Sequence, residues 1–327
     1  MRLTNKQIIS CAAGSVNTKI IDGRIIFGKC TDKQIAAFSS LSPTLGEWSR
    51  ATTGIRLDFH TNSPRVSFFA SKGVKFDVAI NGILVKQFNM KYQREKGTPA
   101  TLEIVPPSDK AIGDGARVTI YFPSHSESGV IDYVELCDGS TFSPHTFDRK
   151  FLFIGDSITQ GWNTKYDSLS FALHLSEMYN AESVVNGVGG AYFHESIFDV
   201  PNFDPDAVFV AYGTNDFSHF GTLSELEYHA KSFFDNLKRE YLDNGKKVIY
   251  ISPITRFDRE QDKPMGSFAA LRSLLIGLAT ERGFFHADGM TLVPPIKELF
   301  ADAVHPNDAG FLHYAASLYT ATSEYLG

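Results

Sequence analysis

The sequence predicts an α/β protein, with a doubly wound parallel sheet of five strands preceded by an all-β domain of the jelly-roll or sandwich type. Three observations predict this fold class. Continuous apolar runs, of the kind that strands buried on both faces require, recur in the second half of the chain. Short alternating segments with tight turns fill the first half. Helical spacing of apolar residues is found almost only between the apolar runs of the second half.

The first part of the chain predicts strands and almost no helix. In one segment Val74, Phe76 and Val78 alternate with polar or small residues, and the turn Asn81-Gly82 follows, which is the strongest short hairpin signal. The expected strands are 55–60, 66–70, 74–80, 83–88, 101–105, 117–122 and 130–136. Seven such strands favour a β-sandwich or jelly roll. Residues 138–144, rich in Gly, Ser and Thr, are expected to link this domain (1–145) to the next (146–327).

The second part alternates strands and helices. Apolar runs predict strands at 151–154, 183–185, 208–212, 247–251 and 284–286. Helices are expected at 222–243, at 309–325, and around the apolar positions Phe268, Leu271, Leu274, Leu275 and Leu278, which share one helical face. This alternation predicts a parallel sheet with helices on both faces.

Polar motifs follow three of these strands at their carboxyl ends, and a fourth motif lies near the C-terminus. The four are Gly155-Asp156-Ser157, Asn186-Gly187-Val188-Gly189-Gly190, Gly213-Thr214-Asn215-Asp216 and Asp302-Ala303-Val304-His305. Ligands of open α/β sheets bind outside the carboxyl ends of the strands. We therefore expect the loops to converge on one crevice.

The motifs contain the groups that a serine hydrolase requires. A serine needs a base to take its proton, a third group must orient that base, and the oxyanion needs fixed donors. Ser157, His305 and Asp302 fit the first three roles, and Gly190 and Asn215 fit the donor role. A proline after His305 disfavours helical backbone there, so two side chains three residues apart can meet in a turn.

From about residue 150 onward the chain resembles the SGNH family, also called GDSL esterases and lipases. The resemblance implies that Ser157 is the nucleophile and that its own N–H joins Gly190 and the Asn215 side chain in the oxyanion hole. It also implies that Asp302 orients His305, the base. Ile158 stands where the family's name-giving motif has Leu, and the adjacent Gly189 leaves the choice of glycine open. We select Gly190, because it precedes the small residue Ala191.

Other interpretations of these residues are weaker. The G-x-S-x-G elbow of α/β-hydrolases is absent, because Thr159 stands where its last glycine belongs. Ser157 as a helix N-cap would leave the other three motifs unexplained. His286 and Asp288 are a conceivable metal pair, but they have no third ligand nearby and are interpreted as a strand end and turn. No metal site and no cofactor are expected.

Composition favours a soluble globular enzyme. A net charge of −6 and a pI near 5.9 give no basic surface for nucleic acid, and no run approaches the ~20 apolar residues of a membrane span. The cysteines Cys11, Cys30 and Cys137 fit reduced thiols. Because residues 8–13 are too short for a signal-peptide core, we expect a cytoplasmic protein, or a secreted one if a signal has been removed. The oligomeric state stays undetermined.

A β-sandwich before an SGNH domain resembles the family-two carbohydrate esterases. The resemblance implies removal of small acyl groups, chiefly acetyl, from carbohydrate hydroxyls. Trp162, Tyr192 and Phe193 are then candidates for an aromatic wall against a sugar ring. The β domain is expected to position substrate, and His125 and Glu127, in the 124–129 loop, are the positions that would test whether this loop lines the crevice. The alternatives are a lysophospholipase or thioesterase of the same family, and a non-enzymatic carbohydrate-binding protein.

Overall fold

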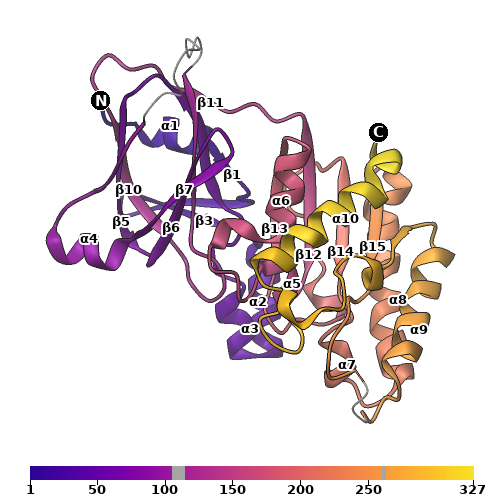
Figure 1. The fold of residues 1–327 in the computed structure, drawn as a ribbon. Coiled ribbons are helices and arrows are strands. Elements are labelled where there is room, and N and C mark those ends of the chain that lie inside the picture. Colours follow the sequence, from indigo (N-terminus) through magenta and orange to yellow (C-terminus); the bar gives the residue numbers. More distant parts are fainter. Residues whose placement is uncertain (105–114, 260–262) are drawn as a thin grey trace.

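The computed structural model describes residues 1–104, 115–259 and 263–327. An N-terminal β region, indigo to magenta in Figure 1, lies beside a C-terminal α/β region, magenta to yellow. Within the described residues, no helix is both long and apolar enough to span a membrane. Residue 105, the last of the strand expected at 101–105, lies outside the described residues.

Two antiparallel sheets form the β region. One has the order β1-β4-β9-β6-β7 with β11 paired to β4, the other has the order β10-β5-β8, and β2 and β3 form a separate hairpin. Side chains such as Phe59, Phe76 and Val134 are buried between them. The strands are β1 Ala12–Ala13, β2 Asn17–Ile21, β3 Arg24–Gly28, β4 Arg56–Thr61, β5 Arg65–Lys72, β6 Lys75–Ile80, β7 Ile83–Asn89, β8 Ala100–Glu103, β9 Ala116–Tyr121, β10 Val130–Leu136 and β11 Ser143–Pro144. All seven expected strands are thus found.

The expectation that this part contains almost no helix is wrong. It contains α1 Asn5–Ser10, α2 Asp32–Leu41, α3 Pro43–Trp48 and α4 Met90–Lys96. A capping box at Thr31 starts α2, and Pro43 starts α3 at a position where its missing N–H costs nothing. Phe38 and Leu45 pack into the core of the α/β region rather than into the sandwich. Figure 1 shows this helix pair beside α5.

The α/β region has a five-stranded parallel sheet in the order β13-β12-β14-β15-β16, as predicted. The sheet is doubly wound. From β12 the chain passes first to β13 on one side, and it then returns to β14 on the other side of β12. The strands are β12 Arg149–Gly155, β13 Ala181–Gly187, β14 Ala207–Ala211, β15 Lys247–Ile251 and β16 Phe285–Ala287.

Helices cover both faces of this sheet. Helices α8 and α9, with α2 and α3, pack on one face, and α6 and α10 pack on the other. The helices are α5 Ser157–Gln160, α6 Phe171–Met178, α7 Asp216–His219, α8 Leu223–Glu240, α9 Phe268–Glu281 and α10 Asp308–Leu326, with 3₁₀ turns at Asp167–Leu169, Glu195–Ile197, Leu242–Asn244, Gly289–Thr291 and Lys297–Leu299. The expected helices at 222–243 and 309–325 correspond to α8 and α10.

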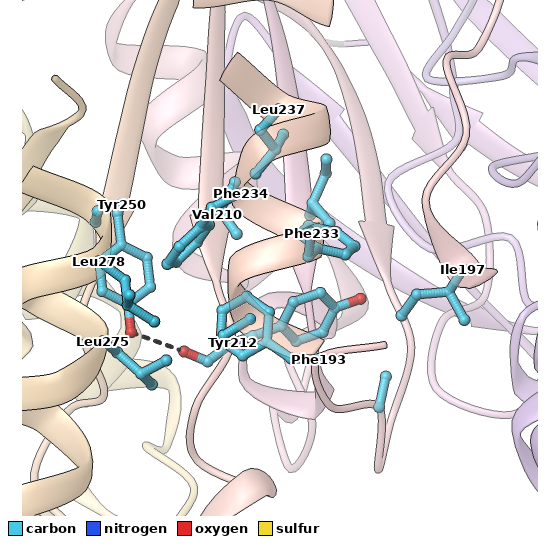
Figure 2. Close-up of a cluster of buried hydrophobic side chains, with 14 of the residues drawn as sticks. Phe193, Ile197, Val210, Tyr212, Phe233, Phe234, Leu237, Tyr250, Leu275 and Leu278 are labelled. Atoms are coloured by element: carbon cyan, nitrogen blue, oxygen red, sulfur yellow. Dashed lines mark hydrogen bonds between the residues drawn. The ribbon is translucent and has the colours of Figure 1, made fainter. Parts of the chain in front are cut away.

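Figure 2 shows the core on the α8 and α9 face. Phe193 lies among Tyr212, Phe233 and Phe234, and the Tyr250 hydroxyl donates a 3.3 Å hydrogen bond to the carbonyl of Tyr212. The aromatic rings meet edge to face, at centroid separations of 5.0–5.7 Å. This packing fixes the segments that follow β13 and β14, which carry the second and third motifs.

Buried polar contacts join the β region to β13. Lys29 Nζ donates to the carbonyl of Gly187 at 2.5 Å, and Arg56 Nη2 donates to the carbonyl of Ala181 at 2.9 Å. Burial lowers the pKa of Lys29 to about 8. Because both side chains are fully buried, these donors hold the two regions together at the strand that leads into the second motif.

Candidate active site

The first motif turns the chain sharply from β12 into α5. A Cβ on Gly155 would lie 2.1 Å from Thr159 Oγ1, so only glycine fits there. The Asp156 carboxylate accepts from the N–H of Ile158 at 2.9 Å and caps α5. Ser157 is therefore the first residue of the helix and not its N-cap, and it lies at the carboxyl end of β12 with its side chain available for contact.

Ser157, His305 and Asp302 form a hydrogen-bonded chain. Ser157 Oγ lies 2.8 Å from His305 Nε2, and His305 Nδ1 lies 2.8 Å from Asp302 Oδ2. A carboxylate can only accept, so the hydrogen on the imidazole is assigned to Nδ1, and Nε2 is left to accept from the serine hydroxyl. The structure thus brings together three groups separated by up to 148 residues in the order a serine hydrolase requires.

Backbone N–H groups fix the turn that holds Asp302. Its Oδ1 accepts from the N–H of Val304 and of His305, both at 2.7 Å. Partial burial works to raise the pKa of Asp302, but hydrogen bonds from these N–H groups and from the imidazole outweigh it and lower the pKa. The carboxylate therefore stays ionised where His305 needs a negative partner.

The two adjacent glycines of the second motif differ in their hydrogen bonding. The Gly189 N–H donates to Gln160 Oε1 at 2.9 Å, whereas the Gly190 N–H has no acceptor among the described residues. Gly190 is also exposed, with a left-handed φ of +76°. Of the two glycines, Gly190 therefore has the N–H available to a ligand.

Asn215 leads into α7 and faces the second motif. Its Nδ2 donates to the carbonyl of Ala191 at 2.9 Å, which uses one of the two amide hydrogens and leaves the other available. The backbone N–H of Ser157 likewise has no acceptor among the described residues. The first, second and third motifs thus each retain one donor without an acceptor among the described residues.

The loop after β15 supports both the donor loop and the base. Arg256 is buried and donates from Nη1 to the carbonyl of Thr214 at 2.6 Å, while Asp258 pairs with its Nε at 2.5 Å. The next N–H, of Phe257, donates to the carbonyl of Ala303 at 2.8 Å. Sequence reasoning did not find this support, because no motif marks it.

Two buried carboxyl groups, Asp156 and Asp216, lie in the first and third motifs. Burial raises the pKa of Asp156 and of Asp216 to about 7. For Asp156, the negative charge of Asp216 adds to the effect of burial. One oxygen of each, Oδ2, has no hydrogen-bond partner among the described residues. A proton on this pair removes the cost of burying two charges, so the folded protein holds protons here that the unfolded chain releases.

Stability should therefore fall as the pH rises through this window. The unfolded carboxyl titrates near 3.8 and the folded one near 7, so between these values the folded state binds more protons and loses stability with increasing pH. Asp216→Asn keeps an acceptor for the N–H of Phe193 but cannot titrate. We expect urea unfolding between pH 4.5 and 7.5 to show a shallower loss of stability in Asp216→Asn, with the exposed Asp235→Asn as control. Parallel slopes in wild type and Asp216→Asn would contradict this.

Two tryptophans from distant parts of the chain meet beside Ser157. The backbone N–H of Trp162 donates to the carbonyl of Ser157 at 2.9 Å. The centroid of its ring lies 4.9 Å from that of Trp48, on α3. A Cβ on Gly189 would lie 2.7 Å from the Trp48 ring, so this indole packs directly on the second motif. Sequence reasoning identified Trp162 but missed Trp48, because α3 was not predicted.

The other expected aromatic residues do not complete this wall. Phe193 is 0% exposed and belongs to the core in Figure 2, so its assignment to a substrate wall is wrong. Tyr192 is half-buried and stacks on His219, with centroids 3.5 Å apart. Tyr192 also packs against this core, as one of its partly buried residues.

The 124–129 loop of the β region reaches the end of α5 through His125. His125 Nε2 lies 2.8 Å from the carbonyl oxygen of Gly161, and its ring contacts Trp162 at 5.2 Å. Glu127 instead accepts from the N–H of Val74 at 3.0 Å and faces the sandwich. Of the two test positions, only His125 therefore contacts the segment that follows Ser157.

One group of side chains in the described residues has the composition of a metal site. The ligand atoms of His194, Glu195 and His229 lie within 4.8 Å of one another. They already have partners, since His229 Nδ1 bonds Glu195 at 2.7 Å and His194 Nδ1 accepts from Ser196. His286 and Asp288 contact Ser252 and Arg272 and lie at a strand end and a turn.

The sequence of the α/β region matches a known family. Residues 153–311 match the GDSL-like Lipase/Acylhydrolase family. This part of the chain belongs to that family. The matched part contains Ser157, Gly190, Asn215, Asp302 and His305. No curated protein sequence matches the chain.

Solved structures of similar fold cover nearly the whole chain. A salicylyl-acyltransferase, SsfX3, from a tetracycline biosynthetic pathway is 16% identical with a TM-score of 0.76, covering 96% of this chain and 94% of that one. A putative GDSL-like lipase from Bacteroides ovatus is 14% identical (TM-score 0.70; 100% and 98% covered). A family-two carbohydrate esterase from Cellvibrio japonicus is 18% identical (TM-score 0.62; 98% and 96% covered). These similarities establish the fold, including the β region before the hydrolase part.

Proposed function

We propose that this protein is a serine esterase that removes small acyl groups, chiefly acetyl, from carbohydrate hydroxyls. The observation that supports it best is the hydrogen-bonded chain from Ser157 through His305 to Asp302, with both bonds at 2.8 Å. Such a chain activates a serine whatever its fold. Its presence with three available donors also argues against a purely carbohydrate-binding role, which would require none of these groups.

The reaction would proceed through an acyl-enzyme. Ser157 Oγ attacks the ester carbonyl carbon while His305 Nε2 takes the hydroxyl proton, and Asp302 stabilises the imidazolium that forms. The oxyanion lies against the N–H groups of Ser157 and Gly190 and the Nδ2 of Asn215. His305 then gives its proton to the departing sugar oxygen. Water, deprotonated by His305, attacks the acyl carbon and releases the acid.

Two observations favour a carbohydrate as the acyl acceptor. Several solved structures of this fold are described as family-two carbohydrate esterases, one of them in complex with cellohexaose and another as an acetyl xylan esterase. In this chain Trp48 and Trp162 are half-buried, lie together and contact the second and first motifs. Flat aromatic surface with polar neighbours suits the apolar face of a sugar ring.

A substrate panel tests this specificity. We expect kcat/KM to be higher for acetylated xylo-oligosaccharides than for the corresponding long-chain acyl esters and acyl thioesters. A tenfold or greater preference for a long acyl ester would favour a lysophospholipase, and one for a thioester would favour a thioesterase. Transfer of the acyl group to an added alcohol rather than to water would instead favour an acyltransferase, as SsfX3 is named.

Variants of the tryptophan pair serve as the internal control of this panel. Trp162→Ala should lower kcat/KM for the oligosaccharide by about tenfold, the equivalent of ~1.4 kcal/mol, and change turnover of a small aryl acetate much less. The reason is that contacts to remote parts of a substrate orient its reacting centre. Equal losses on both substrates would assign Trp162 to the support of Ser157 rather than to the sugar.

A further inference from the structure

In the proposed mechanism Asp302 orients the catalytic base, yet its carboxylate is open to solvent. Its side chain is 44% exposed, whereas that of His305 is 18% exposed. In water a carboxylate can turn toward solvent and lose its bond to the imidazole. Oδ1 is held by two backbone N–H groups of its own turn, but Oδ2, the atom that contacts His305, receives no backbone donor from the described residues.

A side chain from the nucleophile's segment supplies a second donor to this oxygen. Asn163 Nδ2 donates to Asp302 Oδ2 at 2.8 Å, the same distance as the bond from His305 Nδ1. Asn163 is exposed and follows Trp162, just beyond the end of α5. The bond joins residues 139 positions apart, so it links the nucleophile's turn directly to the turn of the acid.

We propose that Asn163 is a positioning residue, which holds Oδ2 of Asp302 toward His305 and shares its negative charge. The inference rests on the proposed function, because it assigns Asn163 a part in the same reaction. The amide acts through Asp302 and does not touch the substrate or the reacting atoms. It completes a set of four donors on the carboxylate, two on each oxygen.

Two effects follow from this geometry. With Asn163 in place, Oδ2 is held by two donors and keeps its direction while the imidazole gains and loses its proton. The same bond neutralises part of the carboxylate charge, which weakens the hold of Asp302 on a protonated imidazole. Loss of the amide should therefore lower kcat and also move the acid limb of the pH–rate profile to higher pH.

An ordinary structural role is the competing explanation. Asn163 has a left-handed φ of +71°, and asparagine is common in that conformation for backbone reasons alone. Asn163→Ala would confuse the two roles, because alanine is strained there. Asn163→Gly removes the amide and keeps the backbone conformation accessible. Asn81→Gly is the matched control, since Asn81 also has a positive φ, of +50°, and also forms one side-chain bond, to the N–H of Arg117.

The experiment records kcat, KM and the pH dependence of aryl acetate hydrolysis, with thermal unfolding of each variant. In Asn163→Gly we expect kcat to fall about fivefold, KM to change less than twofold, and the acid limb to rise by about half a pH unit. Asn163→Asp replaces the donor with a second carboxylate and should lose more kcat and raise the limb further. Asn81→Gly should match the wild type in all three kinetic measurements.

Two results would overturn the proposal. One is an Asn163→Gly variant with wild-type kcat and acid limb. The other is a variant that loses activity only in step with its unfolding temperature, with the limb unmoved, because a purely structural role would have that effect. Either result, in a protein whose turnover still requires Ser157, overturns the role of Asn163 alone. Turnover that does not require Ser157 would overturn the proposed function itself.

Discussion

Replacing Ser157 with alanine is expected to lower kcat for an aryl acetate by up to ~10⁶, because no other group can form the acyl-enzyme. His305→Ala should cost about as much, since the serine and its base act as one unit. Both variants should bind substrate nearly as well as the wild type, because the losses concern the transition state. Steady-state kinetics with purified variants measures both quantities.

Two further variants serve as comparisons for Ser157→Ala and His305→Ala. Asp302→Ala should lose less, about 10⁴, because the imidazole remains close to the serine without it. Ser40→Ala removes an exposed hydroxyl from α2 and should leave kcat unchanged. Within the described residues this hydroxyl bonds only the carbonyl of Ala36. Near wild-type turnover in Ser157→Ala would rule out the proposed mechanism.

Asn215→Ala is expected to lower kcat by about 10²–10³ with little change in KM. The side-chain amide has one hydrogen on the carbonyl of Ala191 and one available, and a donor to an oxyanion acts mainly on the charge that develops in the transition state. The measurement is kcat and KM for an aryl acetate.

Asn244→Ala is the control for loss of an amide. Asn244 Nδ2 donates to the carbonyl of Arg239 on the exposed end of α8, in a part of the structure that supplies no residue to the candidate site. An unchanged kcat in Asn215→Ala would mean that the Asn215 side chain supports the loop, through its bond to the carbonyl of Ala191, and does not bind the oxyanion.

The sequence predicted the framework of the site because its signals are local. Apolar runs such as 151–154 and 208–212 are long enough to identify buried parallel strands, and each is followed at once by a polar motif. Parallel pairing of β12 with β13 and β14 then brings the segments that carry Ser157, Gly190 and Asn215 to one edge of the sheet. The hydrogen bonds from Ser157 to His305 and from His305 to Asp302 join these three residues in the order that a serine hydrolase requires.

Features that depend on tertiary packing could not be predicted in this way. Helices α2 and α3 are short, and their buried residues Phe38 and Leu45 pack against a core formed over 100 residues later. Trp48 was missed with them. The inward direction of Phe193 depends on rings from α8, which no local pattern reveals.

The choice between the two glycines also required the structure. Both fit the motif, and they are separated by the bond from Gly189 to the buried side chain of Gln160 and by the exposure of Gly190. Asn163 is a similar case, because its partner Asp302 lies 139 residues away and the intervening sequence contains no sign of the contact. Pairings of this kind follow from the docking of loops and not from the pattern of any single segment.

The most direct measurement of the central proposal is acetate release from acetylated xylo-oligosaccharides by wild-type and Ser157→Ala protein, purified identically and assayed side by side. The proposed function predicts steady release of acetate by the wild type and release at the uncatalysed background by the variant. Equal release by both proteins, or no release by the wild type from substrates that other carbohydrate esterases deacetylate, would contradict it.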